Sequence, residues 1–140
     1  MSAQGNDGAP PAQVTRQEGA TVLVVDDDED ARELVAEVLR DEGFRVCTAC
    51  DGIEALELAG LHPQPVAMLL DLTMPRMGGR DVLERIRSQP GLANLRICVV
   101  SAETEPPIGA DLAVSKPLLV DRLVRVLTWL RANTSTVASG

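Results

Sequence analysis

Residues 22–27 read VLVVDD, a run of four apolar residues that leads directly into two aspartates. Three further apolar runs also end at polar residues: VAMLL (66–70) before Asp71, ICVV (97–100) before Ser101, and LAV (112–114) before Ser115 and Lys116. Short apolar runs of this kind are typical of buried strands in a parallel sheet. The carboxyl ends of such strands face one crevice, where open α/β sheets bind their ligands. The sequence therefore predicts that three carboxylates, a hydroxyl and an ammonium group meet in one crevice, which suits a divalent cation and a phosphoryl group.

Helical patterns separate these strands. Four helices are expected: the first starts near Asp28 and ends at Gly43, the second starts at the N-cap Asp51, the third follows Gly79, and the last runs from Leu119 to Arg131. Residues 44–48 form a weaker second strand. Each helix carries apolar residues at spacings of three and four, and Gly43 stands where a C-terminal glycine is favoured. The alternation of strand and helix predicts an α/β fold, with a parallel sheet covered by helices on both faces.

The connection between the last two strands interrupts this pattern. Only residues 101–111 separate Val100 from Leu112, and they include Pro106 and Pro107. A parallel crossover needs roughly 10–12 residues in total, loops included. The prolines also remove backbone donors and oppose a helix. We therefore predict that the fourth helix is absent or has about one turn.

Composition sets the domain organisation. Residues 1–20 are rich in Gly, Pro, Gln and Ala and are expected to be a disordered lead-in, residues 21–131 to be one domain, and residues 132–140 to be a flexible tail. Phe44 and Trp129 are the only aromatic residues, so the core must be aliphatic. A net charge of −8 argues against nucleic-acid binding. No run is long and apolar enough for a membrane span, and no signal is present, which predicts a cytoplasmic protein.

Three cysteines invite a metal or redox interpretation. Cys47 and Cys50 form a C-x-x-C pair, and Cys98 lies in the fourth strand. Zinc needs about four ligands, yet His62 is the only histidine. A redox pair is expected at the start of a helix, whereas Cys47 falls inside a strand. We interpret all three as core or loop thiols.

Four motifs resemble those of a known family when they are read in order. VLVVDDDED (22–30), LLDLTMPRMGG (69–79), VVSAE (99–103) and SKP (115–117) are similar to the motifs of the receiver domain of two-component response regulators, the CheY-like domains. Each motif alone is weak, but all four stand in order at strand ends. The resemblance covers about residues 20–131. It implies a flavodoxin-like, doubly wound sheet of five parallel strands in the order 2-1-3-4-5.

The resemblance also assigns the chemistry. It implies that Asp71 is the phosphoacceptor, a carboxylate nucleophile. Lys116 would pair with Asp71 and then with the phosphoryl oxygens. Ser101 would donate to a phosphoryl oxygen once that group is present. The domain is thus expected to be a phosphoacceptor that assists its own phosphorylation and dephosphorylation, rather than an enzyme. The Lys116–Pro117 bond resembles one that is often cis in this family.

A magnesium site is the second implication. Asp26 and Asp27 would hold Mg²⁺ together with Asp71, and the backbone carbonyl of Thr73 would add a ligand. Mg²⁺ keeps several waters and takes few protein carboxylates. Asp26 and Asp27 could instead belong to a solvated acidic helix start, which suits residues 28–30 better.

The sequence also departs from the family. Receivers typically have an aromatic residue where Ala113 stands, and often one where Leu118 stands. With these substitutions and the shortened fourth connection, the chain lacks the usual parts of the face that most receivers use for signalling.

Two functions from different classes follow. One is a stand-alone response regulator, phosphorylated by a sensor histidine kinase or phosphotransfer protein and acting on an unknown protein target; the short segment after Leu130 suggests that no output domain follows. The other is a phosphorylation-independent adaptor with a receiver fold. A third, a magnesium-dependent phosphatase, would need a general acid where Thr73 stands. The intact site favours the first.

Overall fold

The computed structural model describes residues 21–61, 64–74, 77–102 and 107–134. Its centre is one five-stranded sheet in the order β2-β1-β3-β4-β5, and all neighbouring strands pair in parallel. The strands are β1 (Thr21–Val25), β2 (Arg45–Ala49), β3 (Ala67–Asp71), β4 (Arg96–Ser101) and β5 (Leu112–Ser115). This confirms the predicted flavodoxin-like topology, although the second strand lies one residue later than expected.

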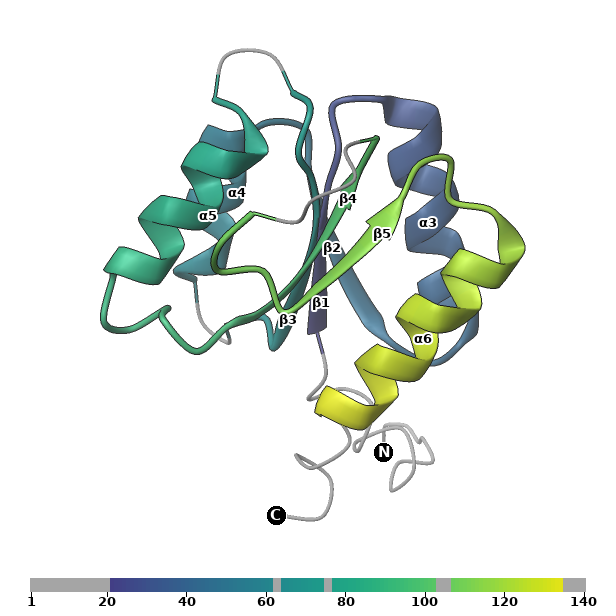
Figure 1. The fold of residues 1–140 in the computed structure, drawn as a ribbon. Coiled ribbons are helices and arrows are strands. Elements are labelled where there is room, and N and C mark those ends of the chain that lie inside the picture. Colours follow the sequence, from purple (N-terminus) through teal and green to yellow (C-terminus); the bar gives the residue numbers. More distant parts are fainter. Residues whose placement is uncertain (1–20, 62–63, 75–76, 103–106, 135–140) are drawn as a thin grey trace, which may run out of the picture.

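Helices cover both faces of the sheet, as Figure 1 shows. Helices α3 (Glu29–Asp41) and α6 (Val120–Thr134) lie on one face, and α4 (Gly52–Ala59) and α5 (Gly79–Ser88) lie on the other. Successive strand residues point to opposite faces, so β1 contributes Leu23 and Val25 to one core and Val22 and Val24 to the other. Both cores are almost wholly aliphatic, as the composition required.

Short-range signals set the helix ends. The Asp28 side chain caps α3 by accepting from the backbone N–H of Asp30 at 3.0 Å, and Asp51 caps α4 by accepting from that of Glu54 at 2.8 Å. Gly43 follows α3 with a φ of 100°, a conformation that favours glycine. The N-cap Asp51 and the C-terminal Gly43 were predicted from the sequence, whereas for Asp28 only the start of the helix was predicted.

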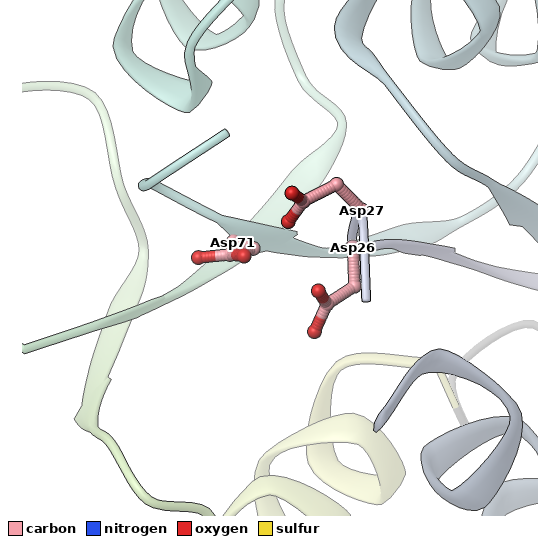
Figure 2. A group of neighbouring side chains, drawn as sticks. All are labelled: Asp26, Asp27 and Asp71. Carbon is pink, nitrogen blue, oxygen red and sulfur yellow. The ribbon is translucent and has the colours of Figure 1, made fainter. Parts of the chain in front are cut away.

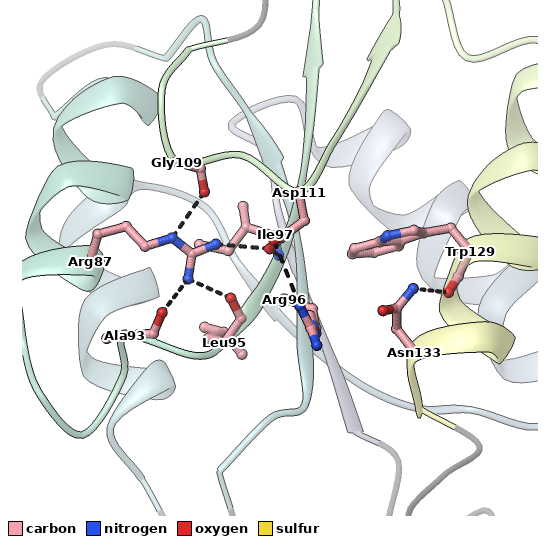
Figure 3. Close-up of polar contacts among 9 residues, drawn as sticks. All are labelled: Arg87, Ala93, Leu95, Arg96, Ile97, Gly109, Asp111, Trp129 and Asn133. Carbon is pink, nitrogen blue, oxygen red and sulfur yellow. Dashed lines mark hydrogen bonds and ion pairs between the residues drawn. The ribbon is translucent and has the colours of Figure 1, made fainter.

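The connection from β4 to β5 contains no helix among its described residues, Ser101, Ala102 and residues 107–111. Arg87, in the last turn of α5, holds this connection instead (Figure 3). Its guanidinium donates to the carbonyl oxygen of Gly109 at 2.9 Å, to those of Ala93 at 2.9 Å and Leu95 at 2.6 Å, and to the Asp111 carboxylate at 2.8 Å. A charged side chain therefore ties α5 to the start of β5.

Two expectations about the helices need correction. Helix α6 continues to Thr134, so three residues expected in the flexible tail are helical; residues 1–20 and 135–140 lie outside the described residues. Leu34 belongs to the apolar stripe of α3 but is 61% exposed. Within the described part of the chain, no helix has the length and apolar character needed to cross a membrane.

The cysteines lie in three different environments. Cys98 is buried, Cys47 is half-buried in β2, and Cys50 is exposed in the loop that follows. Burial raises the pKa of the Cys98 thiol to about 12 and also raises the pKa of Cys47. These thiols are therefore protonated at neutral pH, which agrees with their interpretation as packing residues.

Candidate functional site

Three aspartates meet at the carboxyl edge of the sheet (Figure 2). Asp26 and Asp27 directly follow β1, and Asp71 ends β3. Their strands are neighbours, with Val25 opposite Leu70. One carboxylate oxygen from each aspartate lies within 4.8 Å of the others. The sheet therefore brings together the three carboxylates that the sequence predicted would meet.

Asp71 is the buried member of this cluster, with only 3% of its surface exposed. Its Oδ1 accepts a hydrogen bond from the backbone N–H of Thr73 at 3.0 Å. The same oxygen forms an ion pair with Nζ of Lys116 at 2.8 Å. A buried carboxylate needs such partners because burying an unpaired charge is costly. Asp71 is thus held in one orientation, with its charge compensated.

Lys116 reaches the site because it directly follows β5. Its backbone N–H donates to the carbonyl oxygen of Ser101 at 2.9 Å, and the Lys116–Pro117 bond is cis, as expected. Burial lowers the pKa of the Lys116 ammonium, but the hydrogen bond and charge of Asp71, with the charges of Asp26 and Asp27, outweigh this effect and raise its pKa. The ammonium therefore stays charged at neutral pH.

Local contacts fix Asp26. Its Oδ1 accepts from the backbone N–H of Asp28 at 2.9 Å. Its backbone oxygen accepts from Nη1 of Arg32 at 2.9 Å, and its backbone N–H donates to the carbonyl oxygen of Ala49 at 3.1 Å. Burial, helped by the nearby charge of Asp71, raises the pKa of the Asp26 carboxyl. Arg32 was not predicted from the sequence, where its only signal is its position one helical turn into α3.

Ser101 and Thr73 lie next to the cluster, Ser101 in the neighbouring strand and Thr73 two residues along the chain from Asp71. Ser101 is buried at the end of β4, one residue after Val100, which pairs with Asp71. Thr73 is exposed and contacts Asp71 through its backbone N–H. Both residues lie at the predicted edge of the sheet, and the roles of their hydroxyl and carbonyl groups stay predictions.

A pocket of about 540 Å³ opens over this cluster. Six polar residues line it: Asp26, Asp27, Asp28, Asp71, Thr73 and Lys116. The rest of the lining is apolar and comes mainly from α3 and from the segment that follows β5. Three neighbouring carboxylates fit a hard cation such as Mg²⁺, which prefers oxygen ligands.

Residues 22–128 match the response regulator receiver domain, which is more than half of the chain. This protein belongs to that family. A receiver is a phosphoacceptor signalling module of two-component systems rather than a classical enzyme.

Similar proteins of known name are also response regulators or transcriptional regulators. This receiver is 38% identical over 127 residues to the probable transcriptional regulatory protein TcrX of Mycobacterium tuberculosis, which covers 86% of this chain and 54% of TcrX. It is 35% identical over 99 residues to the two-component response regulator ORR11 of Oryza sativa, which covers 71% of this chain and 61% of ORR11. The chain thus spans about half the length of the mycobacterial relatives.

Solved structures share the fold. The chemotaxis protein CheY4 of Vibrio cholerae superposes with a TM-score of 0.71 at 31% identity, over 79% of this chain and 98% of CheY4. The Mn²⁺-bound form of the response regulator Rcp1 superposes with a TM-score of 0.67 at 22% identity, over 81% of this chain and 92% of Rcp1. The second likeness concerns the fold alone.

Proposed function

We propose that this receiver stores a signal as an aspartyl-phosphate on Asp71. The observation that carries the proposal is the buried Asp71 carboxylate, with Lys116 Nζ at 2.8 Å and two further carboxylates beside it. In the transfer step, a carboxylate oxygen of Asp71 bonds to phosphorus while the bond from phosphorus to the donor group breaks. The electron pair of that bond leaves with the donor.

Asp26, Asp27 and Asp71, with the backbone carbonyl of Thr73, would hold Mg²⁺. When bound, the ion offsets the negative charge of the phosphoryl oxygens. Burial raises the pKa of the Asp26 carboxyl, and the neighbouring charge of Asp71 adds to this effect. Arg32 and the N–H of Asp28 keep Asp26 in place, so the chain holds the cluster ready for a cation.

Lys116 and Ser101 would act on the phosphoryl group. In the unphosphorylated site the ammonium of Lys116 pairs with Asp71. Once Asp71 is esterified, that ammonium pairs with a phosphoryl oxygen instead, and the hydroxyl of Ser101 donates to another. Both contacts exist only with the phosphoryl group present, so they can change the population of two states.

The donor would be a sensor histidine kinase or a phosphotransfer protein, and the output a protein–protein contact. Action as a stand-alone regulator stays a prediction, because the relatives named as transcriptional regulators are about twice as long. A cytoplasmic location is a separate prediction from the sequence. An adaptor that works without phosphorylation is the second candidate. It is favoured by the connection from β4 to β5, whose described residues contain no helix.

Incubation with acetyl phosphate and Mg²⁺, followed by intact mass measurement, tests the proposal. We expect one added phosphoryl group that needs Mg²⁺ and is lost in Asp71→Asn. An unmodified wild-type protein that is still folded would contradict the proposal and favour the adaptor. Labelling that persists in Asp71→Asn would place the acceptor elsewhere.

A further inference from the structure

Three polar groups of Asp26 are held by other parts of the chain. Its backbone N–H donates to the carbonyl oxygen of Ala49 at 3.1 Å, and its Oδ1 accepts from the backbone N–H of Asp28 at 2.9 Å. Its backbone oxygen accepts from Nη1 of Arg32 at 2.9 Å. Arg32 differs from the other two partners because it acts through a side chain, so a substitution can remove this contact and leave the backbone groups in place.

The surroundings of Arg32 allow it to hold Asp26 firmly. The Arg32 side chain is only 14% exposed, and it also lies 3.8 Å from the carboxylate of Glu33, which is 55% exposed. Such a surface pair contributes little, whereas a charged group withdrawn from water needs its hydrogen bonds. Arg32 belongs to α3, a helix whose Val35 and Leu39 are buried against the sheet. The Asp26 carbonyl is therefore tied to a rigid element.

Rigid ligands affect Mg²⁺ and Ca²⁺ differently. Mg²⁺ demands near-ideal octahedral geometry at about 2.0–2.1 Å, whereas Ca²⁺ accepts flexible geometries at about 2.3–2.6 Å. One carboxylate oxygen from each of Asp26, Asp27 and Asp71 lies within 4.8 Å of the others. Asp71 is fixed as well, by the N–H of Thr73 and the ammonium of Lys116. Two of the three carboxylates thus have fixed partners, which hinders the expansion that the larger ion needs.

We propose that Arg32 is a positioning residue that makes the aspartate cluster select Mg²⁺ over Ca²⁺. The proposal rests on the proposed function, in which this cluster holds the cation for phosphoryl transfer to Asp71. Arg32 does not itself bind the ion, because it acts through the backbone of Asp26. Without that contact the loop after β1 gains freedom, so the cluster adapts to the larger ion and holds the smaller one less well.

Ion titrations of the whole, unphosphorylated chain test this. The backbone amide signals of Asp28 and Thr73 report binding in NMR spectra, because these N–H groups donate to Asp26 and Asp71. Titration with magnesium chloride and with calcium chloride gives a Kd for each ion, and the ratio of the Ca²⁺ value to the Mg²⁺ value is compared between proteins. The two ions carry the same charge, so the effect of removing the positive charge of Arg32 cancels in this ratio.

Two variants remove the contact in different ways. Arg32→Met keeps an apolar stem and a similar helix propensity, and Arg32→Gln keeps a polar end on a shorter side chain. Loss of an outer contact typically weakens metal affinity about 10- to 100-fold, and flexible coordination spares Ca²⁺ part of that loss. We expect the ratio to fall about fivefold in both variants. Circular dichroism shows that each is folded, and Arg32→Gln decides the matter if Arg32→Met is not.

Arg40→Met is the matched control. Arg40 lies in the last turn of the same helix and also donates to a backbone carbonyl, that of Val46 at 3.4 Å. Val46 lies in β2 rather than in the aspartate cluster. The control therefore removes the same charge and the same kind of contact from α3, and it should keep the wild-type ratio.

The outcomes are distinct. An unchanged ratio in the folded Arg32 variants overturns this inference, and it leaves the proposed function intact if acetyl phosphate and Mg²⁺ still label Asp71 in wild type. An equal fall in Arg40→Met also overturns it, because the effect would then not depend on the contact with Asp26. A wild-type protein that binds Ca²⁺ as tightly as Mg²⁺ overturns it as well. Failure of Mg²⁺ and acetyl phosphate to label wild type contradicts the proposed function itself.

Discussion

Replacement of Arg87 by methionine tests whether a charged side chain secures the connection from β4 to β5. Arg87→Met keeps the apolar stem and similar helix propensity but removes four hydrogen bonds, to Gly109, Ala93, Leu95 and Asp111. The Asp111 carboxylate would keep the backbone N–H of Ile97, which lies 2.8 Å away.

The magnitude follows from partial burial. Breaking a fully buried ion pair costs about 3–5 kcal/mol, and leaving buried carbonyls unpaired adds to this cost. Arg87 and Asp111 side chains are 22% and 30% exposed, so water replaces part of what is lost. We therefore expect Arg87→Met to lower the free energy of unfolding by about 3 kcal/mol, which corresponds to a fall in Tm of roughly 10–15 °C for a domain of this size.

Urea denaturation followed by circular dichroism measures this difference, provided that the slope with denaturant is unchanged. Arg85→Met is the matched control, since Arg85 lies exposed on the same helix; surface changes of this kind usually stay within about 0.5 kcal/mol. Equal stabilities for Arg87→Met and Arg85→Met would refute the reasoning, because the connection would then be held by other contacts.

Three further predictions concern the aspartate cluster. Millimolar Mg²⁺ should raise the Tm of wild type by mass action, whereas Asp27→Ala should stay folded and show no shift in differential scanning calorimetry; no shift in wild type would contradict the metal assignment. Without Mg²⁺, Asp26→Asn should be more stable than wild type at pH 7, because a raised carboxyl pKa means that folding disfavours the charged form. That gain should shrink as the pH falls through the folded pKa and vanish near the unfolded value of 3.8; a gain that is independent of pH would refute this cause. Lys116→Ala should greatly lower the rate at which acetyl phosphate labels Asp71, while the Tm should change little. An unchanged labelling rate would show that Lys116 takes no part in the transfer.

The position of the site could be predicted from the sequence because the order of the strands determines where most of the site residues lie. Once apolar runs are assigned to neighbouring parallel strands, the residues that follow them must share one edge of the sheet. This reasoning placed Asp26, Asp27 and Asp71 together without any knowledge of how their side chains are oriented. The cap Asp51 could be predicted equally well, because it acts within three residues along the chain.

Periodicity was less informative about the pocket. The spacing of Leu34 on α3 assigns it to the apolar stripe, and the stripe does face the sheet. The end of that stripe nearest the aspartates continues past the core into the pocket wall, where Leu34 is 61% exposed. The spacing of apolar residues predicts which way a side chain points but not whether other residues cover it. A residue that lines a pocket and a residue at the edge of the core therefore show the same spacing.

The pairing of Arg87 with Asp111 lay beyond sequence reasoning for a different reason. The two residues are 24 positions apart, and their contact depends on how residues 107–111 turn over α5. The result concerns the site as well as the fold. Asp111 anchors one end of β5, since its N–H donates to Ile97 and its carboxylate accepts from Arg87. The other end of this four-residue strand leads directly to Lys116. A strand this short has little freedom to shift at one end alone, so the contacts of Arg87 and Asp111 also help to place the lysine beside Asp71.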